Sequence, residues 1–537
     1  MRILTPAAST LLLGLINTVS YGQVYSLDPG FGTAGKATIA FPAAAATDVA
    51  TSLVLQPDGK IVVAGQNNDS FGVARLTATG LPDATFGTAG TANTTFAPPL
   101  GASPTITIQY AQATTLLLQA DGKLVAAGLV RSSGPSYRGY ARYLPSGVLD
   151  TSFDGDGKVI PYNSEGSLGS SVTGLKQQAD GKLLSIGRQM GLTGSVSSPL
   201  YRLETNGAAD NTYTWTYPSA GPNSSNPIFD KTVSASAVDA TGRLITAGAH
   251  FVSNQNYTGP QGPALVRYTN TGQPDATFGT DGLAILTAAN GGSGLEWKKM
   301  ALLPDGKILV GSLKVRGVGA QQRVDSVSIA RYTANGTLDL AFGRRGLATT
   351  NFSGVAATNG QALSGLHVLP GGDITYGVLT DAGTFNVVQV SGNGRQVTLP
   401  SVIALPGLQV ADMILQPDGK ALLVGTQTDG AAKRFTVVRL TTTALLGTRG
   451  RLSDAQVQLF PNPAAQSITL RLAGIAESQS FKLQVFDVLG REVLAQAAAR
   501  LVGGAVQLPL QTLRPGSYTL RAQGTDFTVT RQFVRTE

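Results

Sequence analysis

The sequence contains no cysteine, which excludes disulfide bonds, thiolate catalysis and cysteine-ligated metal sites. Histidine is nearly as scarce, because His250 and His367 are the only two copies in 537 residues, and this leaves little for metal binding or acid–base catalysis. Charged residues make up 13% of the chain, and the formal net charge of +8 is spread without a block of like charge. Because nucleic-acid surfaces need clustered lysine and arginine, the dispersed charge argues against a nucleic-acid partner.

Long hydrophobic runs are also scarce, and the run near the N-terminus is too short to span a bilayer comfortably. Residues 1–22 combine Arg2, an apolar stretch from Ala7 to Val19, and small residues before Gln23. This is the pattern of a secretory signal peptide. We therefore expect export, and no transmembrane span in the mature chain.

Glycine, by contrast, is abundant, and much of it falls in one recurring turn. Apolar runs flank Pro57-Asp58-Gly59 and predict a β-hairpin, because proline fixes φ, aspartate bonds its own backbone and glycine accepts a left-handed conformation. The turn occurs seven times, with its glycine at positions 59, 122, 181, 242, 306, 372 and 419. The sequence therefore predicts seven similar units of about sixty residues each.

Each unit holds four candidate strands, placed in the first unit at Gly35–Phe41, Asp48–Gln56, Lys60–Gln66 and Phe71–Ala78. Seven such units predict an all-β fold, a seven-bladed β-propeller over residues 23–447, because radial repetition leaves few exposed strand edges. The alternative is an open β-solenoid, which would need caps at its ends.

An ion pair is expected to close the ring. An arginine recurs on the fourth expected strand, and in the first five units an aspartate follows eight residues later. In the sixth unit Gln389 and Val397 replace both residues together, as a direct pair predicts, because an unpaired buried charge is unfavourable. The seventh unit keeps Arg439 without its aspartate, whereas a spare Asp-x-x-Phe-Gly segment begins at Asp28. We predict that Asp28 pairs with Arg439 and that the N-terminal segment docks beside the last blade.

The repeats differ mainly in their loops. In the expected blades, the stereotyped turn and the link to the next blade lie on one face of the ring, and nearly every insertion falls in the 1–2 and 3–4 loops on the other. Variable loops on a rigid ring are a usual place for binding. Tyr137, Tyr257 and Trp297 lie in or beside these loops and are the candidate ligand contacts, unless each ring packs against its own loop.

No catalytic, cofactor-binding or metal-ligating residue is predicted. Turn chemistry accounts for the repeated aspartates, and the sequence has no Gly-x-Ser-x-Gly, His-Glu-x-x-His or phosphate-binding glycine loop. The sequence favours non-catalytic binding of a glycan or another surface polymer, without a cofactor. The alternatives are a secreted hydrolase or lyase that uses loop carboxylates, and an adhesive or surface-layer protein.

Three phrases recur in order through residues 27–447, and in the first unit they are Pro57–Gly65, Ala74–Gly80 and Asp83–Gly87. Together they resemble the delta-60 repeat proteins of bacteria. The resemblance implies a repeat architecture and no particular activity.

A linker at 448–453 precedes alternating apolar strands over 454–537, which predict a small β-sandwich. This region resembles the C-terminal sorting domain of the bacteroidete type IX secretion system, and the matching residues are Pro461, Asn462, Pro463, Asp487, Gly490, Gly516 and Tyr518. The resemblance implies handling by the type IX machinery, passage across the outer membrane and removal of the tail. The mature protein would then be extracellular or attached to the outer cell surface.

Overall fold

A computed structural model of the chain separates into two compact units, Met1–Thr443 and Ala444–Glu537. The expected signal peptide and the linker at 448–453 lie outside the described residues. No helix in the described part is long and apolar enough to cross a membrane. The structure describes residues 23–41, 48–99, 101–161, 167–191, 196–216, 218, 228–252, 262–287, 291–292, 295–316, 323–356, 363–369, 371–381, 383–396, 400–444, 457–473, 475, 480–487, 491–524 and 528–537.

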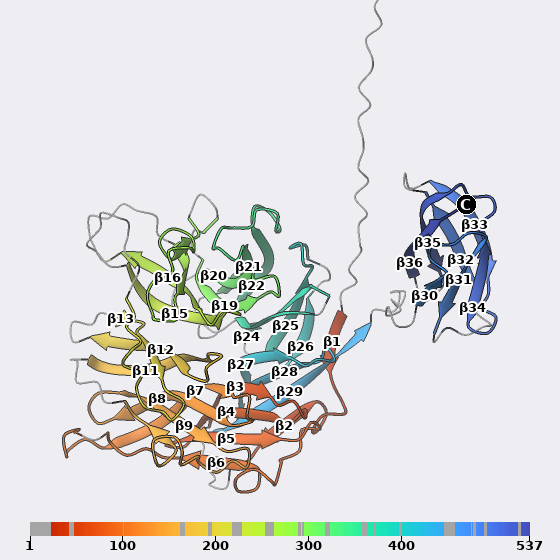
Figure 1. Cartoon of the computed structure of the whole chain (residues 1–537). Helices are drawn as coiled ribbons and strands as arrows, with labels where there is room; N and C mark the ends of the chain where they lie inside the picture. Colours follow the sequence, from red (N-terminus) through yellow and green to blue (C-terminus); the bar gives the residue numbers. More distant parts are fainter. Residues whose placement is uncertain are drawn as a thin grey trace, which may run out of the picture. The chain divides into compact units, whose positions relative to one another are not determined.

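The described residues of the first unit form seven small antiparallel sheets, numbered here 1 to 7 in chain order (Figure 1). Sheet 1 contains β3 (Val49–Leu55), β4 (Ile61–Asn67), β5 (Ser70–Leu76) and β6 (Thr91–Thr94). Sheet 2 contains β7 (Ile108–Leu118), β8 (Leu124–Ser132), β9 (Tyr137–Tyr143) and β10 (Lys158–Val159). Sheet 3 contains β11 (Ser167–Gln177), β12 (Leu183–Gly191), β13 (Val196–Ser197) and β14 (Leu200–Leu203).

The remaining sheets follow the same plan. Sheet 4 contains β15 (Ile228–Val238), β16 (Leu244–Val252), β17 (Gly262–Tyr268) and β18 (Leu283–Ile285). Sheet 5 contains β19 (Trp297–Leu302), β20 (Ile308–Arg316), β21 (Arg323–Tyr332) and β22 (Leu347–Ala356). Sheet 6 contains β23 (Leu363–Val368), β24 (Ile374–Asp381), β25 (Thr384–Val390) and β26 (Ser401–Ala404). Sheet 7 joins β27 (Leu408–Leu415), β28 (Ala421–Asp429) and β29 (Ala432–Ala444) to the N-terminal strands β1 (Gln23–Leu27) and β2 (Lys36–Ile39).

The first strands of the sheets surround a common axis. They contact one another in a closed cycle that runs from β3 through β7, β11, β15, β19, β23 and β27 and back to β3. Small sheets repeated around an axis are the architecture of a β-propeller. The prediction of an all-β fold with a β-propeller is therefore confirmed.

The expected strand boundaries of the repeat units are wrong by one strand. Gly35–Phe41 was expected to begin the first blade, but β2 pairs with β29 in sheet 7, from Lys36 opposite Val438 to Ile39 opposite Phe435. A repeat period defines the length of a unit but not the strand with which a blade begins. That strand depends on which sheet the edge strand pairs with, and here β2 pairs with β29. The glycine turn consequently joins strands 1 and 2, and the insertions fall in the 2–3 and 4–1 connections on the opposite face.

The recurring turn has the geometry that its residues predict. All seven turn glycines have φ between +80° and +87°. Asp58 Oδ1 accepts the Lys60 N–H at 3.1 Å, and the same bond recurs at Asp121, Asp180, Asp305 and Asp418. These aspartates therefore stabilise turns.

Six arginines join neighbouring sheets, each on the strand that follows strand 2 and pairs with it, here called the third strand. In sheet 3 this arginine lies on β14, because β13 and β14 both pair with β12. In sheet 1, Arg75 Nε lies 2.7 Å from Asp83 Oδ2, its Nη1 donates to the carbonyl of Pro145 in sheet 2, and its guanidinium lies 4.8 Å from the Phe86 ring centroid. The same three contacts recur around Arg142, Arg202, Arg267, Arg331 and Arg439, with Tyr213 as the aromatic ring at Arg202.

The structure brings Asp28 and Arg439 together, with Oδ2 2.8 Å from Nε. Arg439 also donates to the carbonyl of Ala78 in sheet 1 and packs over Phe31, so the N-terminal segment completes the junction between sheets 7 and 1. In Figure 1 the red N-terminal strands accordingly lie beside β29.

The junction between sheets 6 and 7, which lacks the arginine, is occupied by Tyr25 of β1. The Tyr25 N–H donates to Ser401 Oγ at 2.9 Å, and its hydroxyl interacts with Gln389, the residue that replaces the arginine. Tyr25 is 2% exposed and packs with residues of both sheets. The N-terminal segment thus supports two neighbouring junctions.

The second unit has two sheets that share one hydrophobic core, which includes Leu470, Leu483, Leu520 and Phe533. The first sheet joins β30 (Val457–Phe460), β31 (Ser467–Leu472) and β34 (Ala505–Pro509). The second joins β33 (Glu492–Ala499), β32 (Phe481–Phe486), β35 (Gly516–Gln523) and β36 (Thr528–Arg535).

We expect Asp28→Ala to destabilise the first unit by about 3–5 kcal/mol, because it leaves the charge of Arg439 buried and unpaired. Asp83→Ala should cost a similar amount. Glu296→Ala, which breaks an exposed pair with Lys298, should cost about 1 kcal/mol or less. Urea unfolding of the three variants measures the differences, and equal effects of Asp28→Ala and Glu296→Ala would contradict a closing role for Asp28.

The propeller should become less stable as the pH falls. Burial alone would raise the pKa of Asp150, but hydrogen bonds from Ser152 and the charges of Arg142 and Lys123 outweigh it and lower the pKa to about 2. A carboxylate with a lowered folded-state pKa stabilises the fold above its unfolded pKa of about 4, and this contribution disappears as the pH falls toward 2. The free energy of unfolding should therefore fall between pH 5 and pH 2.5, and Asp150→Asn should make that fall shallower by roughly 1–2 kcal/mol.

Candidate functional site

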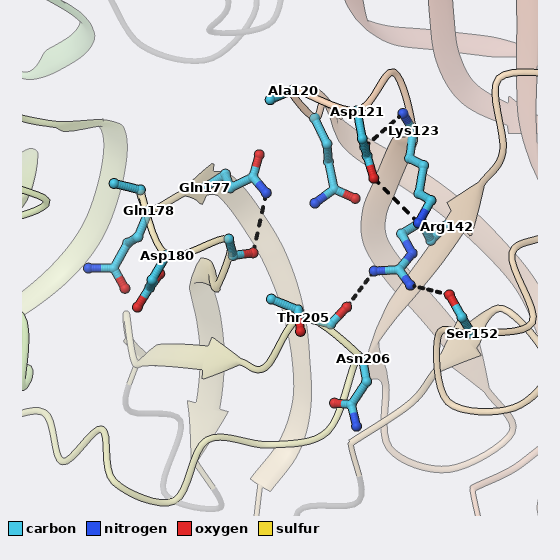
Figure 2. A pocket seen from close by; sticks show the side chains of 13 residues that line it. Ala120, Asp121, Lys123, Arg142, Ser152, Gln177, Gln178, Asp180, Thr205 and Asn206 are labelled. Atoms are coloured by element: carbon cyan, nitrogen blue, oxygen red, sulfur yellow. Dashed lines mark hydrogen bonds and ion pairs between the residues drawn. The ribbon is translucent and has the colours of Figure 1, made fainter.

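A cleft of about 710 Å³ lies between sheets 2 and 3, on the face of the stereotyped turns (Figure 2). Its polar side chains already bind one another. Arg142 donates to the Thr205 carbonyl and to Ser152, and Lys123 lies 3.3 Å from both Asp121 and Asp150. Five other junctions carry an arginine with the same contacts, so this cleft belongs to the repeated architecture and is not a site specific to sheets 2 and 3.

A second cavity, of about 600 Å³, lies at the opposite end of the axis, where the first strands begin. We call it the channel mouth. Its lining comes from β3, β7, β15, β19, β23 and β27 and includes Thr51, Gln112, Thr114, Ser234, Lys298 and Gln409. These strands follow the 4–1 connections, so the channel mouth opens on the face of the variable loops.

A β-bulge in every first strand shapes the channel mouth. In all seven strands the register shifts around the residue eight positions before the turn glycine, and these bulge residues are Thr51, Thr114, Thr173, Ser234, Lys298, Ser364 and Ala411. Bulges re-aim side chains and often lie beside functional sites. Thr51 Oγ1 lies within hydrogen-bond distance of the Ala64 carbonyl in its own sheet and the Ala113 carbonyl in the next, so the bulges also join neighbouring strands.

The channel mouth offers hydrogen-bonding groups that no other described residue uses. The side-chain amides of Gln112 and Gln409 have no hydrogen-bond partner among the described residues, and each amide can donate and accept. The two lysines are each paired, Lys298 with Glu296 at 2.7 Å and Lys299 with Asp412 at 3.1 Å. The mouth is therefore polar and close to electrically neutral.

Two of the three expected aromatic contacts, Tyr137 and Trp297, are buried and do not line the channel mouth. Trp297 is fully buried and packs edge-on against Tyr332, because the bulge at Lys298 directs the lysines to the channel and leaves Trp297 between sheets. Tyr137 is 7% exposed and belongs to the hydrophobic cluster between sheets 1 and 2. Tyr257 lies outside the described residues.

Sequence reasoning missed the charged residues of the channel. Lys176, Lys299, His367 and Asp412 line a deeper cavity of about 290 Å³, although they come from four different repeats. The available signal was positional, because each stands five or seven residues before a turn glycine. Residues with this spacing lie on one face of a strand and therefore face the same axis.

The residues expected to mark the sorting tail hold the second unit together. Asn462 Oδ1 accepts the Val534 N–H at 2.9 Å, and Asp487 accepts two N–H groups of Arg491. Tyr518 donates to the Arg514 carbonyl, and its ring stacks on Phe533. Pro461 and Pro463 follow cis peptide bonds, Gly516 begins β35, and Gly490 lies outside the described residues.

Comparison with known families explains these residues. Residues 458–536 match the secretion system C-terminal sorting domain. The chain ends in a type IX sorting domain. This sorting domain directs export to the cell surface or the extracellular space. Residues 56–86, 119–153, 240–278 and 303–342 match a domain of unknown function, the DUF5122 β-propeller. A comparison with curated proteins gave no match.

Several solved structures resemble this chain at low sequence identity. The polysaccharide lyase Uly1 is 12% identical with a TM-score of 0.43, covering 76% of this chain and 93% of that one. A catalytically inactive virginiamycin B lyase from Staphylococcus aureus with quinupristin is 11% identical with a TM-score of 0.39, covering 77% and 99%. The Nup133 β-propeller domain of Vanderwaltozyma polyspora is 7% identical with a TM-score of 0.40, covering 79% and 99%. At these identities no activity is carried over.

Truncation after Gly450 should abolish export while leaving the propeller folded, because the two units have separate cores. In a host with type IX secretion, we expect the truncated protein to accumulate in the periplasm with an unchanged melting temperature. As a control, residues 458–536 fused to a secreted reporter should carry the reporter to the surface or the medium. Normal surface levels of the truncated protein would contradict the role of the sorting domain.

Proposed function

We propose that this exported protein binds a glycan or another surface polymer at the channel mouth, without transforming it. The observation that supports the proposal is the cavity of about 600 Å³ that Thr51, Thr114 and Ser234 line together with Gln112 and Gln409, two glutamines whose side-chain amides have no hydrogen-bond partner among the described residues. Convergent polar groups in a preformed cavity are typical of ligand sites, and amides and hydroxyls match the donors and acceptors of sugar hydroxyls.

The channel gives less support to the hydrolase or lyase alternative. Glycosidases of the usual kind need two carboxyl groups that flank the scissile bond. Among the described residues that line the two channel cavities, Asp412 is the one carboxylate, and Lys299 holds it at 3.1 Å. Binding through uncharged polar groups therefore accounts better for the described surface.

Replacing both free amides should weaken binding. In a screen of purified polysaccharides with the mature chain, Gln112→Ala combined with Gln409→Ala should lower affinity roughly tenfold, because each lost hydrogen bond costs about 0.5–1.5 kcal/mol. Asn206→Ala is the matched control, since Asn206 lines the cleft on the opposite face. Loss of binding with Asn206→Ala alone would move the site to that cleft and contradict the proposal.

A further inference from the structure

The deeper cavity, which we call the inner channel, gathers four titratable side chains in about 290 Å³. They are Lys176 of β11, Lys299 of β19, His367 of β23 and Asp412 of β27. The same strand positions in the other repeats carry small, apolar or hydroxyl side chains, for example Ser52, Thr115, Leu117 and Ala301. The charges are therefore specific to this channel and are not required by the repeat.

Lys176 is the uncompensated charge of this group. No described residue lies within hydrogen-bond or ion-pair distance of its amino group, although protein surrounds the cavity that it faces. Burial lowers the pKa of Lys176, the charge of Asp412 partly opposes that shift, and the charge of Lys299 adds to it. A buried lysine without an ion-pair partner is stabilised in its charged form when an anion binds beside it.

None of the other three side chains supplies a negative charge that pairs with Lys176. Asp412 is committed to Lys299, with Oδ1 3.1 Å from Nζ. His367 Nε2 lies 2.7 Å from the carbonyl oxygen of Met413, which can only accept, so Nε2 carries a hydrogen. No described residue bonds the second ring nitrogen of His367, which becomes a second donor when the ring is protonated.

The inner channel has room and a route of entry. Gly174, Ala235 and Gly365 contribute no bulk to its wall, and a Cβ at Gly365 would lie 2.9 Å from His367 Nε2. Ser234 and Lys299 line both the inner channel and the channel mouth, so the two cavities adjoin. A small group can therefore reach Lys176 from the face of the variable loops.

We propose that the inner channel binds a small oxyanion, a sulfate, phosphate or carboxylate group, between the amino group of Lys176 and the ring of His367. The anion is either free or carried by the molecule that occupies the channel mouth. This site stands independently of the proposed polymer binding, because it depends on Lys176 and His367 and not on the amides of the mouth. Charge-assisted hydrogen bonds to an ammonium and an imidazolium supply the affinity.

The binding should depend on pH in a defined direction. Burial lowers the pKa of His367 as well as that of Lys176, so both lose their protons at lower pH than free side chains do. The other charged groups that face the cavity are Lys299 and Asp412, which form an ion pair with each other. Affinity for an oxyanion should therefore increase as the pH falls toward 5 and decrease as it rises toward 9.

Titration calorimetry of the mature chain with sodium sulfate and sodium phosphate tests the site. We expect binding to wild type and at least a tenfold loss in Lys176→Met, which removes the buried charge but keeps an unbranched side chain of similar length. Lys298→Met, at the mouth, should bind sulfate like wild type, and so should the variant with Gln112→Ala and Gln409→Ala. Absence of sulfate binding in wild type, or unchanged binding in Lys176→Met, would overturn the proposal.

A second measurement separates an anion site from a structural lysine. After reductive ¹³C-methylation, the resonance that is missing in Lys176→Met reports the pKa of this lysine in the wild-type chain. Saturating sulfate should raise that pKa, whereas an unmoved titration would contradict contact with the anion. Glucuronate and a sulfated polysaccharide, compared with its desulfated form, then distinguish a free anion from one carried by a polymer.

Discussion

Each junction with a third-strand arginine depends on one guanidinium that binds both neighbours. The planar fork allows Nε to bind a carboxylate of its own sheet while Nη1 reaches a carbonyl of the next sheet, as for Arg75 with Asp83 and Pro145. The aromatic ring beneath the guanidinium excludes water, so the charge is buried and fully paired. Hydrophobic clusters then fill the space between successive sheets rather than one central core. The ring is therefore stabilised by a local contact that is repeated, and its axis is left free for polar side chains.

Features that rest on local chemistry could be predicted from the sequence. The turn at Gly59 follows from residues within four positions, and the partnership of Asp28 with Arg439 follows from counting which arginines lack an aspartate. The strand with which each blade begins could not be predicted from the repeat, because the pairing of β2 with β29 in sheet 7 is a contact between the two ends of the ring. The β-bulges could not be predicted from the sequence either, because a bulge residue such as Thr51 does not change the composition of its strand. In the fifth repeat the bulge at Lys298 places Lys299 in the channel and leaves Trp297 buried between sheets, and the sequence pattern does not reveal this reversal.

The channel shows how a repetitive scaffold acquires a specific site. Seven equivalent backbone positions surround the axis at each level, so a change in one repeat adds one side chain to a shared space. Lys176, Lys299, His367 and Asp412 come from repeats 3, 5, 6 and 7, and none of them has a counterpart in repeat 1. The structural contacts lie on the face of the stereotyped turns, away from these positions. Specificity in the channel can consequently change without disturbing the junctions that hold the ring.

Closure by the N-terminal segment also constrains the order in which the protein can fold. Asp28 and Arg439 are 411 residues apart, and until the last sheet has been synthesised the strands β1 and β2 have no partner. Contacts of such high sequence separation form slowly, because the chain loses loop entropy before the contact stabilises it. Sheets 1 to 6 can therefore form as an open arc whose two edges stay exposed until β29 has been synthesised and pairs with β1 and β2.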